Sequence, residues 1–206
     1  MTIAAVLFDI GNVLIQWQPE RYFDRRIGPE RRRALFAEVA LHAMMDEIDS
    51  GAPFGDTVEA WARDHAGWAE EIRRFHDDWT GLAQPEIPRS VRLLQALKAR
   101  GHRVFALSNF GVQNFPLSVA AHPFLDLFDR RYISGEMGLI KPDPAIYAAV
   151  EADCGLAPDT LLFTDDRADN IAAAAARGWQ THLFDGAAGW AQCLVEAGLL
   201  TGKEAA

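Results

Sequence analysis

Residues 3–13 read IAAVLFDIGNV, six apolar residues followed by a loop that contains Asp9, Gly11 and Asn12. An unbroken apolar run that ends in a polar loop is typical of a strand buried on both faces, as in a parallel sheet covered by helices. The run therefore predicts a central strand, with Asp9 at its carboxyl end.

Three later runs repeat this pattern. Residues 103–107 lead into Ser108 and Asn109, residues 160–164 lead into Asp165 and Asp166, and residues 180–184 form the last such run. Helical periodicity separates the runs, over residues 91–97, 144–153 and 168–177, with Asp143 as an expected N-cap and Gly101 and Gly178 as stop signals.

Strands that alternate with helices predict an α/β fold, a Rossmann-like parallel sheet flanked by helices and joined by right-handed crossovers. Ligands of such sheets bind outside the carboxyl ends of the strands. We therefore expect the polar residues that follow the strands to converge on one crevice; they are Asp9, Ser108, Asn109, Asp165 and Asp166.

The interval between Asp9 and Ser108 is 99 residues, much longer than one helical crossover requires. Apolar residues recur within it at helical spacing, from Leu35 to Ala43 and from Trp61 to Trp79. We predict an α-helical cap over residues 17–85, inserted into a catalytic core of residues 1–16 and 86–206. Trp17 and residues 46–51 are the candidates for substrate contacts within the cap.

Composition narrows the classes of function. The chain has 206 residues and a net charge of −9, which opposes nonspecific binding to nucleic acid or anionic lipid. Its two cysteines fit neither a metal motif nor a disulfide framework. No apolar run approaches the roughly 20 residues of a membrane span, and the N-terminal residues lack an export signal. We expect a cytoplasmic protein without nucleic-acid or membrane partners; its oligomeric state is not predicted.

Four short segments carry a family resemblance: FDIGNV at 8–13, LSN at 107–109, KPDP at 141–144 and FTDDRADN at 163–170. In this order, and with a cap-sized gap after the first, they resemble the motifs of the haloacid dehalogenase-like hydrolase superfamily, in its helical-cap branch. The resemblance implies a Mg²⁺-dependent phosphatase that hydrolyses a small phosphorylated metabolite.

The resemblance also implies roles for the motif residues. Asp9 resembles the nucleophile, which forms an aspartyl-phosphate during hydrolysis. Asp9, the backbone carbonyl of Gly11 and Asp166 resemble the Mg²⁺ ligands, an all-oxygen set suited to that ion. In this register Asn170 supports Asp166 from outside, whereas a shift of one residue would select Asp165 and Asp169 instead.

The remaining motifs imply the residues that bind the phosphate. Ser108 and Asn109 resemble the phosphate-binding second motif, which offers hydrogen-bond donors to the transferring group. Lys141 resembles the catalytic cation that neutralises both the nucleophile and the substrate phosphate.

Position 11 departs from the common pattern. Most phosphatases of this superfamily have a second Asp there as general acid and base, whereas this chain has Gly11, as in relatives with an Asp-x-Gly-Asn-Val motif. General acid–base help is worth about 10²–10⁴-fold, so we expect a substrate with a weakly basic leaving group, such as a hexose 1-phosphate. Two alternatives stay open: a metal-independent 2-haloacid dehalogenase, and a weakly active protein that binds a phosphate ligand.

Overall fold

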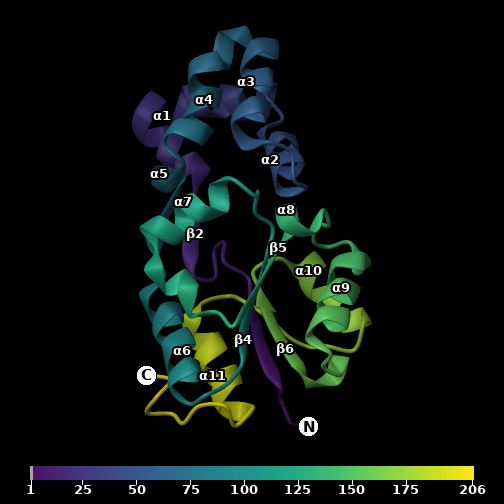
Figure 1. Cartoon of the computed structure of the whole chain (residues 1–206). Coiled ribbons are helices and arrows are strands. Elements are labelled where there is room, and N and C mark those ends of the chain that lie inside the picture. The colour runs from purple at the N-terminus through teal and green to yellow at the C-terminus, as the bar shows by residue number, and fades with distance from the viewer. Residues whose placement is uncertain (1) are drawn as a thin grey trace.

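The computed structural model describes residues 2–206 and is built around a five-stranded parallel sheet (Figure 1). The strand order is β5-β4-β1-β6-β7. The strands are β1 (Ala5–Phe8), β4 (Val104–Ser108), β5 (Arg130–Ile133), β6 (Leu161–Asp165) and β7 (Gln180–Leu183). The predicted Rossmann-like α/β fold is confirmed.

Strand β1 occupies the centre of the sheet, where Phe8 is paired with Ala106 of β4 and with Thr164 of β6. Because parallel strands in register end together, Asp9, Ser108 and Asp165 come to the same edge of the sheet. Within this sheet, β5 is the strand that the sequence patterns did not reveal. Its first two residues are exposed arginines on an edge strand, so it lacks the apolar run used to recognise the others.

Alternate residues of β1 face two different helical layers, as the period of two in a strand requires. Val6 and Phe8 belong to the apolar cluster that includes α6 (Pro88–Ala99) and α11 (Ala187–Glu196). Ala5 and Leu7 belong to the cluster with α9 (Pro144–Cys154) and α10 (Ala168–Ala176). The central strand is thus buried on both sides, and its chain can turn toward solvent only at its ends.

Local signals set the bounds of the layer helices. The carboxylate of Asp143 accepts a hydrogen bond from the backbone N–H of Ala145 at 2.8 Å, so it caps α9 as expected. The same helix ends at Gly155, whose φ of 65° lies in the left-handed region that favours glycine.

The helices that precede α6 in the chain gather beyond the carboxyl ends of the strands (Figure 1). They are α1 (Pro19–Glu38), α2 (Leu41–Asp49), α3 (Phe54–Asp64), α4 (Ala69–Asp77) and α5 (Trp79–Leu82), with the short 3-10 helix η1 (Ala66–Trp68) between α3 and α4. Strands β2 (Ile15–Trp17) and β3 (Ala83–Glu86) pair antiparallel where the chain enters and leaves this region. We call α1 to α5 the cap; its proposed limits at residues 17 and 85 stay a prediction.

The apolar periodicity from Trp61 to Trp79 does not belong to one helix. The chain leaves helical geometry at His65, with φ −121° and ψ 60°, and Ile72 and Phe75 lie on α4 while Trp79 lies on α5. Ile72, Phe75 and Trp79 are nonetheless buried, because separate short helices turn the same apolar face toward the cap interior.

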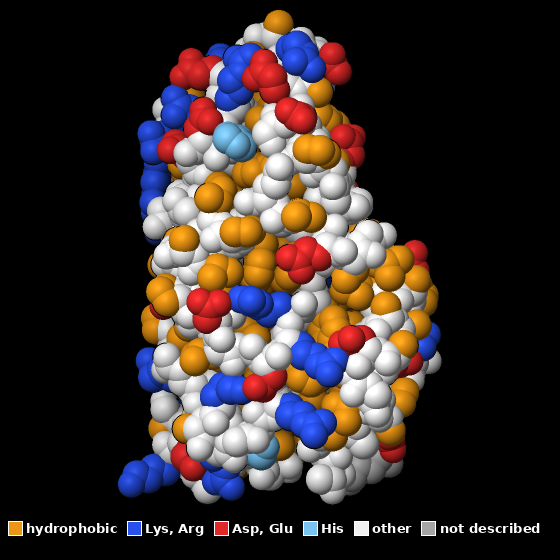
Figure 2. All heavy atoms as spheres, viewed as in Figure 1, with side chains coloured by type: hydrophobic (Ala, Val, Ile, Leu, Met, Phe, Trp, Pro, Cys, Tyr) orange, Lys and Arg blue, Asp and Glu red, His pale blue; other side chains and the backbone are white. Residues whose placement is uncertain are grey.

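The remaining elements connect the layers. They are α7 (Asn114–Ala121), α8 (Ser134–Met137) and the 3-10 helices η2 (Pro123–Leu127) and η3 (Pro158–Thr160). On the face shown in Figure 2, side chains of both charge signs are interspersed, and hydrophobic side chains are visible where the cap meets the core. Within residues 2–206, none of the helices has both the length and the apolar character needed to cross a bilayer.

Candidate active site

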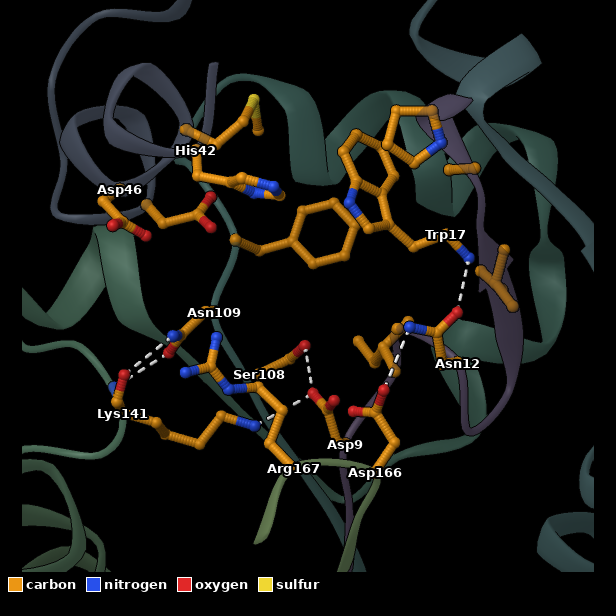
Figure 3. A pocket seen from close by; sticks show the side chains of 18 of the residues that line it. Asp9, Asn12, Trp17, His42, Asp46, Ser108, Asn109, Lys141, Asp166 and Arg167 are labelled. Atoms are coloured by element: carbon orange, nitrogen blue, oxygen red, sulfur yellow. Dashed lines mark hydrogen bonds and ion pairs between the residues drawn. The ribbon is translucent and has the colours of Figure 1, made fainter. Parts of the chain in front are cut away.

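The carboxyl ends of β1, β4 and β6 open into a cavity of about 280 Å³ beneath the cap. The structure brings the six residues predicted for the site to the lining of this one cavity: Asp9, Gly11, Ser108, Asn109, Lys141 and Asp166. Figure 3 shows Asp9, Ser108, Lys141 and Asp166 on the floor, with His42, Asp46 and Trp17 across the cavity from them.

Asp9 is held by two donors. The Ser108 hydroxyl donates to Asp9 Oδ1 at 2.6 Å, and Lys141 Nζ lies 3.0 Å from the same oxygen. Burial raises the pKa of Asp9 to about 6; Lys141 opposes this shift, the charge of Asp165 adds to it, and the Ser108 hydrogen bond opposes it. The second carboxylate oxygen is left free of these contacts, in a position to meet a ligand in the cavity.

Lys141 is almost completely buried, with 4% of its surface exposed. Its ammonium group donates to the Leu107 carbonyl at 2.9 Å and to Asp165 Oδ2 at 2.6 Å, and its third neighbour is Asp9. Burial alone would lower the pKa of Lys141, but the charges of Asp9 and Asp165 more than compensate and raise it. Lys141 is therefore a permanent cation between two carboxylates.

The adjacent residues Asp165 and Asp166 have different surroundings. Asp165 is fully buried, and its oxygens accept hydrogen bonds from Lys141, from the backbone N–H of Arg167 and from Asn170. Asp166 is partly exposed and accepts one side-chain hydrogen bond, from Asn12 at 3.0 Å. Burial raises the pKa of Asp166. Asp166 thus has lone pairs open to the cavity, whereas the lone pairs of Asp165 already accept hydrogen bonds from protein donors.

Asn170 was expected to support Asp166, and this prediction was wrong. Its amide donates to both oxygens of Asp165, at 3.0 Å each, and not to Asp166. Asn170 lies in the first turn of α10, and Asp165, the last residue of β6, is the carboxylate that lies within reach of its side chain. The alternative partner Asp169 instead pairs with Arg167 at 2.6 Å.

Asn12 supports Asp166 in place of Asn170, a role that the sequence analysis missed. Its side chain donates to Asp166 and accepts from the backbone N–H of Trp17, both at 3.0 Å. Its φ is 55°, a left-handed conformation that asparagine tolerates better than most residues. The signal was present, because Asn12 lies within the first motif, but its partner becomes visible only once β1 and β6 are side by side.

Asn109 also has a contact that its motif did not suggest. Its amide donates to the Lys141 carbonyl at 3.0 Å and accepts from the Lys141 backbone N–H at 2.9 Å. This paired contact fixes the loop that carries Lys141 against the end of β4. The predicted contact of Asn109 with the substrate phosphate stays a prediction.

One oxygen each of Asp9, Asp165 and Asp166 lies within 4.8 Å of the other two. Such a concentration of carboxylates, with Lys141 as the neighbouring cation, fits the oxygen-rich set that Mg²⁺ prefers. Since Asp165 is already saturated, Asp9, Asp166 and the Gly11 carbonyl are the groups that would hold the ion.

The opposite wall of the cavity comes largely from the cap and is mainly apolar. Its large side chains are Trp17, Phe36, Leu41, Met45, Phe75 and Trp79. The indole N–H of Trp79 donates to the Ser118 hydroxyl at 2.9 Å, so it is not available to a ligand. Polar groups on this wall include His42, Asp46 and Asp49. Of the cap residues predicted to contact the substrate, Trp17, Asp46 and Asp49 line the cavity.

Comparisons with known proteins show which proteins the chain is similar to. The model of the haloacid dehalogenase-like hydrolases matches residues 3–178. A sesquiterpene phosphatase from Aspergillus oryzae is 27% identical over 186 residues, which are 89% of this chain and 91% of that protein. A D-ribitol-5-phosphate phosphatase from Bacteroides thetaiotaomicron is 22% identical over 200 residues, 92% and 96% of the two chains.

Comparison with solved structures shows the same fold in related enzymes. A HAD family enzyme from Bacteroides thetaiotaomicron, in complex with magnesium and inorganic phosphate, superposes with a TM-score of 0.72 at 26% identity, over 89% of this chain and 95% of that one. An L-2-haloacid dehalogenase from Xanthobacter autotrophicus shares the fold, with a TM-score of 0.62 at 22% identity over 87% and 76% of the two chains.

Proposed function

This chain belongs to the haloacid dehalogenase-like hydrolase family, and we propose that within it the protein is a Mg²⁺-dependent phosphatase that acts through an aspartyl-phosphate. The observation that carries the proposal is the carboxylate cluster of Asp9 and Asp166, which line the cavity, and the buried Asp165, with Lys141 between Asp9 and Asp165. A phosphate ester is a dianion, so a site that attacks it with a carboxylate must first offset negative charge.

Asp9 is the nucleophile in this proposal. Ser108 and Lys141 hold one of its oxygens, which orients the other toward the cavity. Attack on phosphorus forms the Asp9 O–P bond and breaks the bond to the ester oxygen; water then hydrolyses the aspartyl-phosphate and restores the carboxylate. Lys141 stays protonated throughout and offsets charge on Asp9 and on the phosphoryl group.

Mg²⁺ would be held by Asp9, the Gly11 carbonyl and Asp166. When bound, the ion supplies positive charge that lets the Asp9 carboxylate approach the phosphate dianion. Magnesium and phosphate together in the related Bacteroides thetaiotaomicron enzyme support this assignment.

The identity of the organic group is a separate question. The sequence predicts a sugar phosphate such as a hexose 1-phosphate, from the absence of an acid at position 11. The cavity favours a hydrophobic organic group, because a sugar would need several hydrogen-bond partners and the cap wall offers mainly aromatic and aliphatic surface. The related sesquiterpene phosphatase supports this second choice. We therefore propose a hydrophobic phosphate monoester as the substrate class.

The test is phosphate release from hexyl phosphate, glycerol phosphate and glucose 1-phosphate, with Mg²⁺ and with excess chelator. Hexyl and glycerol phosphate have similarly basic leaving groups and differ mainly in polarity. We expect the highest kcat/KM for hexyl phosphate. Faster hydrolysis of glucose 1-phosphate would favour the weakly basic leaving group over the apolar wall.

The two alternatives predict other outcomes of the same panel. A 2-haloacid dehalogenase would release halide from 2-chloropropionate without Mg²⁺ and no phosphate from any ester. The Asp166 carboxylate argues against it, because without a cation it would repel a carboxylate substrate. A binding protein would bind phosphate ligands but turn over none of the esters.

A further inference from the structure

Transfer of the phosphoryl group to Asp9 requires a proton for the departing oxygen, because an alkoxide is a strong base. The attacking and leaving oxygens lie roughly in line across phosphorus. With Asp9 on the floor, the leaving oxygen points toward the cap. Gly11 has no side chain that could donate this proton, so we look for the donor on the cap wall.

Three side chains on that wall can carry a proton: His42, Asp46 and Asp49, all on α2. His42 and Asp46 are exposed to solvent, whereas Asp49 is partly buried at the carboxyl end of the helix. A partly buried carboxyl group is the better candidate for a neutral acid near pH 7, since burial disfavours its charged form.

Contacts between cap and core hold the segment that carries Asp49. The Ser134 hydroxyl donates to the backbone carbonyl of Asp49 at 2.6 Å. The neighbouring Ile48 packs so closely on Gly111 that a Cβ at residue 111 would lie 2.5 Å from Ile48 Cγ2. Asp49 is therefore positioned by the strand-end loops of the core, close to where Asp9 reacts, although it belongs to the cap.

The charges around Asp49 favour the protonated form. Burial, followed by the charges of Asp46 and Asp9, raises the pKa of Asp49 to about 7, against the opposing effects of Lys141 and the backbone N–H of Gly111. These are the groups that face Asp49 from its own helix, from β1, from the Lys141 loop and from the loop before α7.

We propose that Asp49 is the general acid and base of the reaction, an inference that rests on the proposed phosphatase function. As the bond between phosphorus and the ester oxygen breaks, its electron pair goes to that oxygen, which takes the proton of the Asp49 carboxyl group. Water then occupies the place of the departed alcohol. Asp49 removes a proton from it while the water oxygen attacks phosphorus and the bond to Asp9 breaks, which leaves Asp49 protonated for the next turnover.

The test compares two leaving groups in the Asp49→Asn variant. The ratio kcat/KM reports the steps up to loss of the alcohol, and 4-nitrophenolate is a weak base that departs without a proton. We expect kcat/KM to fall about 10²–10⁴-fold for hexyl phosphate but only a few-fold for 4-nitrophenyl phosphate. Asp49→Glu should restore part of the loss. An equal fall for both esters, or no fall for either, would overturn the proposal.

The pH dependence of kcat/KM gives a second test, because a residue with a purely structural role would not change it. The acid must be protonated, so kcat/KM for hexyl phosphate should decline as pH rises through the pKa of Asp49. Removing the neighbouring charge with Asp46→Asn lowers that pKa and should move the decline to lower pH, whereas Asp64→Asn, an exposed cap residue, should leave it in place. A decline that stays at the same pH in Asp49→Asn would contradict the assignment.

Failure of this inference and failure of the proposed function are distinguishable. If the wild-type protein releases phosphate from neither ester, the phosphatase proposal falls. If the wild-type protein is active and Asp49→Asn shows no dependence on the leaving group, Asp49 alone is misassigned. Thermal unfolding of the variant, compared with the wild type, separates a catalytic loss from a folding defect.

Discussion

Asp165 and Asp166 are adjacent in the sequence, but their surroundings give them different tasks. Asp165 neutralises the buried Lys141, and Asp166 faces the cavity with one hydrogen bond from Asn12. Lys141 keeps Asp9 as a partner when Asp165 is replaced. An Asn at position 165 would instead turn an amide N–H toward the buried donors of Lys141 and Asn170, and a buried donor left unpaired costs about 1–3 kcal/mol. A substitution at each position should therefore have a distinct effect.

We predict that Asp165→Asn lowers the free energy of unfolding by about 1–3 kcal/mol, measured by urea denaturation without metal. Asp166→Asn should leave that free energy within about 1 kcal/mol of the wild-type value and raise the Mg²⁺ concentration for half-maximal activity at least about tenfold. The reverse pattern, with Mg²⁺ dependence altered chiefly at Asp165, would show that the ligand assignment is off by one residue.

Asp49 should also affect stability in a way that depends on pH. Its pKa of about 7 in the folded protein lies above the usual value of 3.8, so the unfolded chain releases the proton first and stability falls as pH rises between these values. Asn cannot ionise. We predict that Asp49→Asn, measured in chelator, raises Tm by about 2–8 °C at pH 8. This range corresponds to a stabilisation of about 1–2 kcal/mol, at about 2–4 °C per kcal/mol. At pH 4 the substitution should change Tm little.

The matched control for this measurement is Asp64→Asn, an exposed acid of the same cap. It should leave Tm nearly unchanged at both pH values. If Asp49→Asn behaved like the control, the Asp49 carboxyl group would be ionising normally and would be a poor acid at neutral pH.

At the scale of elements, the predictable parts are those whose local pattern matches their environment. Strands β1, β4 and β6 are buried on both faces and read as apolar runs, and α9 carries its own N-cap at Asp143. Strand β5 lies at an edge and begins with two exposed arginines, so nothing local marks it.

In the cap, apolar spacing indicated the buried positions Ile72, Phe75 and Trp79. The face predicted from Leu35 to Ala43 was wrong in part, because α1 ends at Glu38, α2 begins at Leu41 and Ala43 is exposed. The breaks between helices depend on how the short helices pack on one another.

Helix α8 and the loop after β4 are two core segments that touch each other and also contact the cap, at Asp49 and Ile48 respectively. A single substitution can test their close packing. A Cβ at Gly135, in α8, would lie 2.8 Å from the Phe110 carbonyl oxygen and 2.9 Å from the Val112 nitrogen, both backbone atoms that cannot move aside cheaply. We predict that Gly135→Ala lowers the free energy of unfolding by about 1–3 kcal/mol. It should also reduce kcat/KM, because neighbouring Ser134 holds the Asp49 carbonyl.

Gly67 provides the comparison, because a Cβ there would meet no atom within 4 Å. Gly67→Ala should leave both the unfolding free energy and kcat/KM close to their wild-type values. Equal effects of the two substitutions would mean that the close approach of α8 to the loop after β4 does not help to hold the Asp49 segment in place.

For the molecule as a whole, the floor of the cavity was more predictable from the sequence than the wall formed by the cap. Parallel strands in register bring Asp9, Ser108 and Asp166 to one edge whatever the details of packing, so motif order was enough. The partners of Asn170 and Asn109, and the place of Asp49 in the lining of the cavity, depend on side-chain directions and on how the cap docks. These contacts join segments that are far apart in the chain, so the spacing of residues in the sequence does not predict them.

The central claim is that Asp9 and Mg²⁺ together cleave a phosphate ester. Phosphate release from 4-nitrophenyl phosphate tests it most directly, because this ester needs little help from an acid and is independent of the role proposed for Asp49. We predict that release requires Mg²⁺, stops in excess chelator and is lost in Asp9→Asn. Release that continues in Asp9→Asn, or that is unaffected by removal of Mg²⁺, would contradict the account.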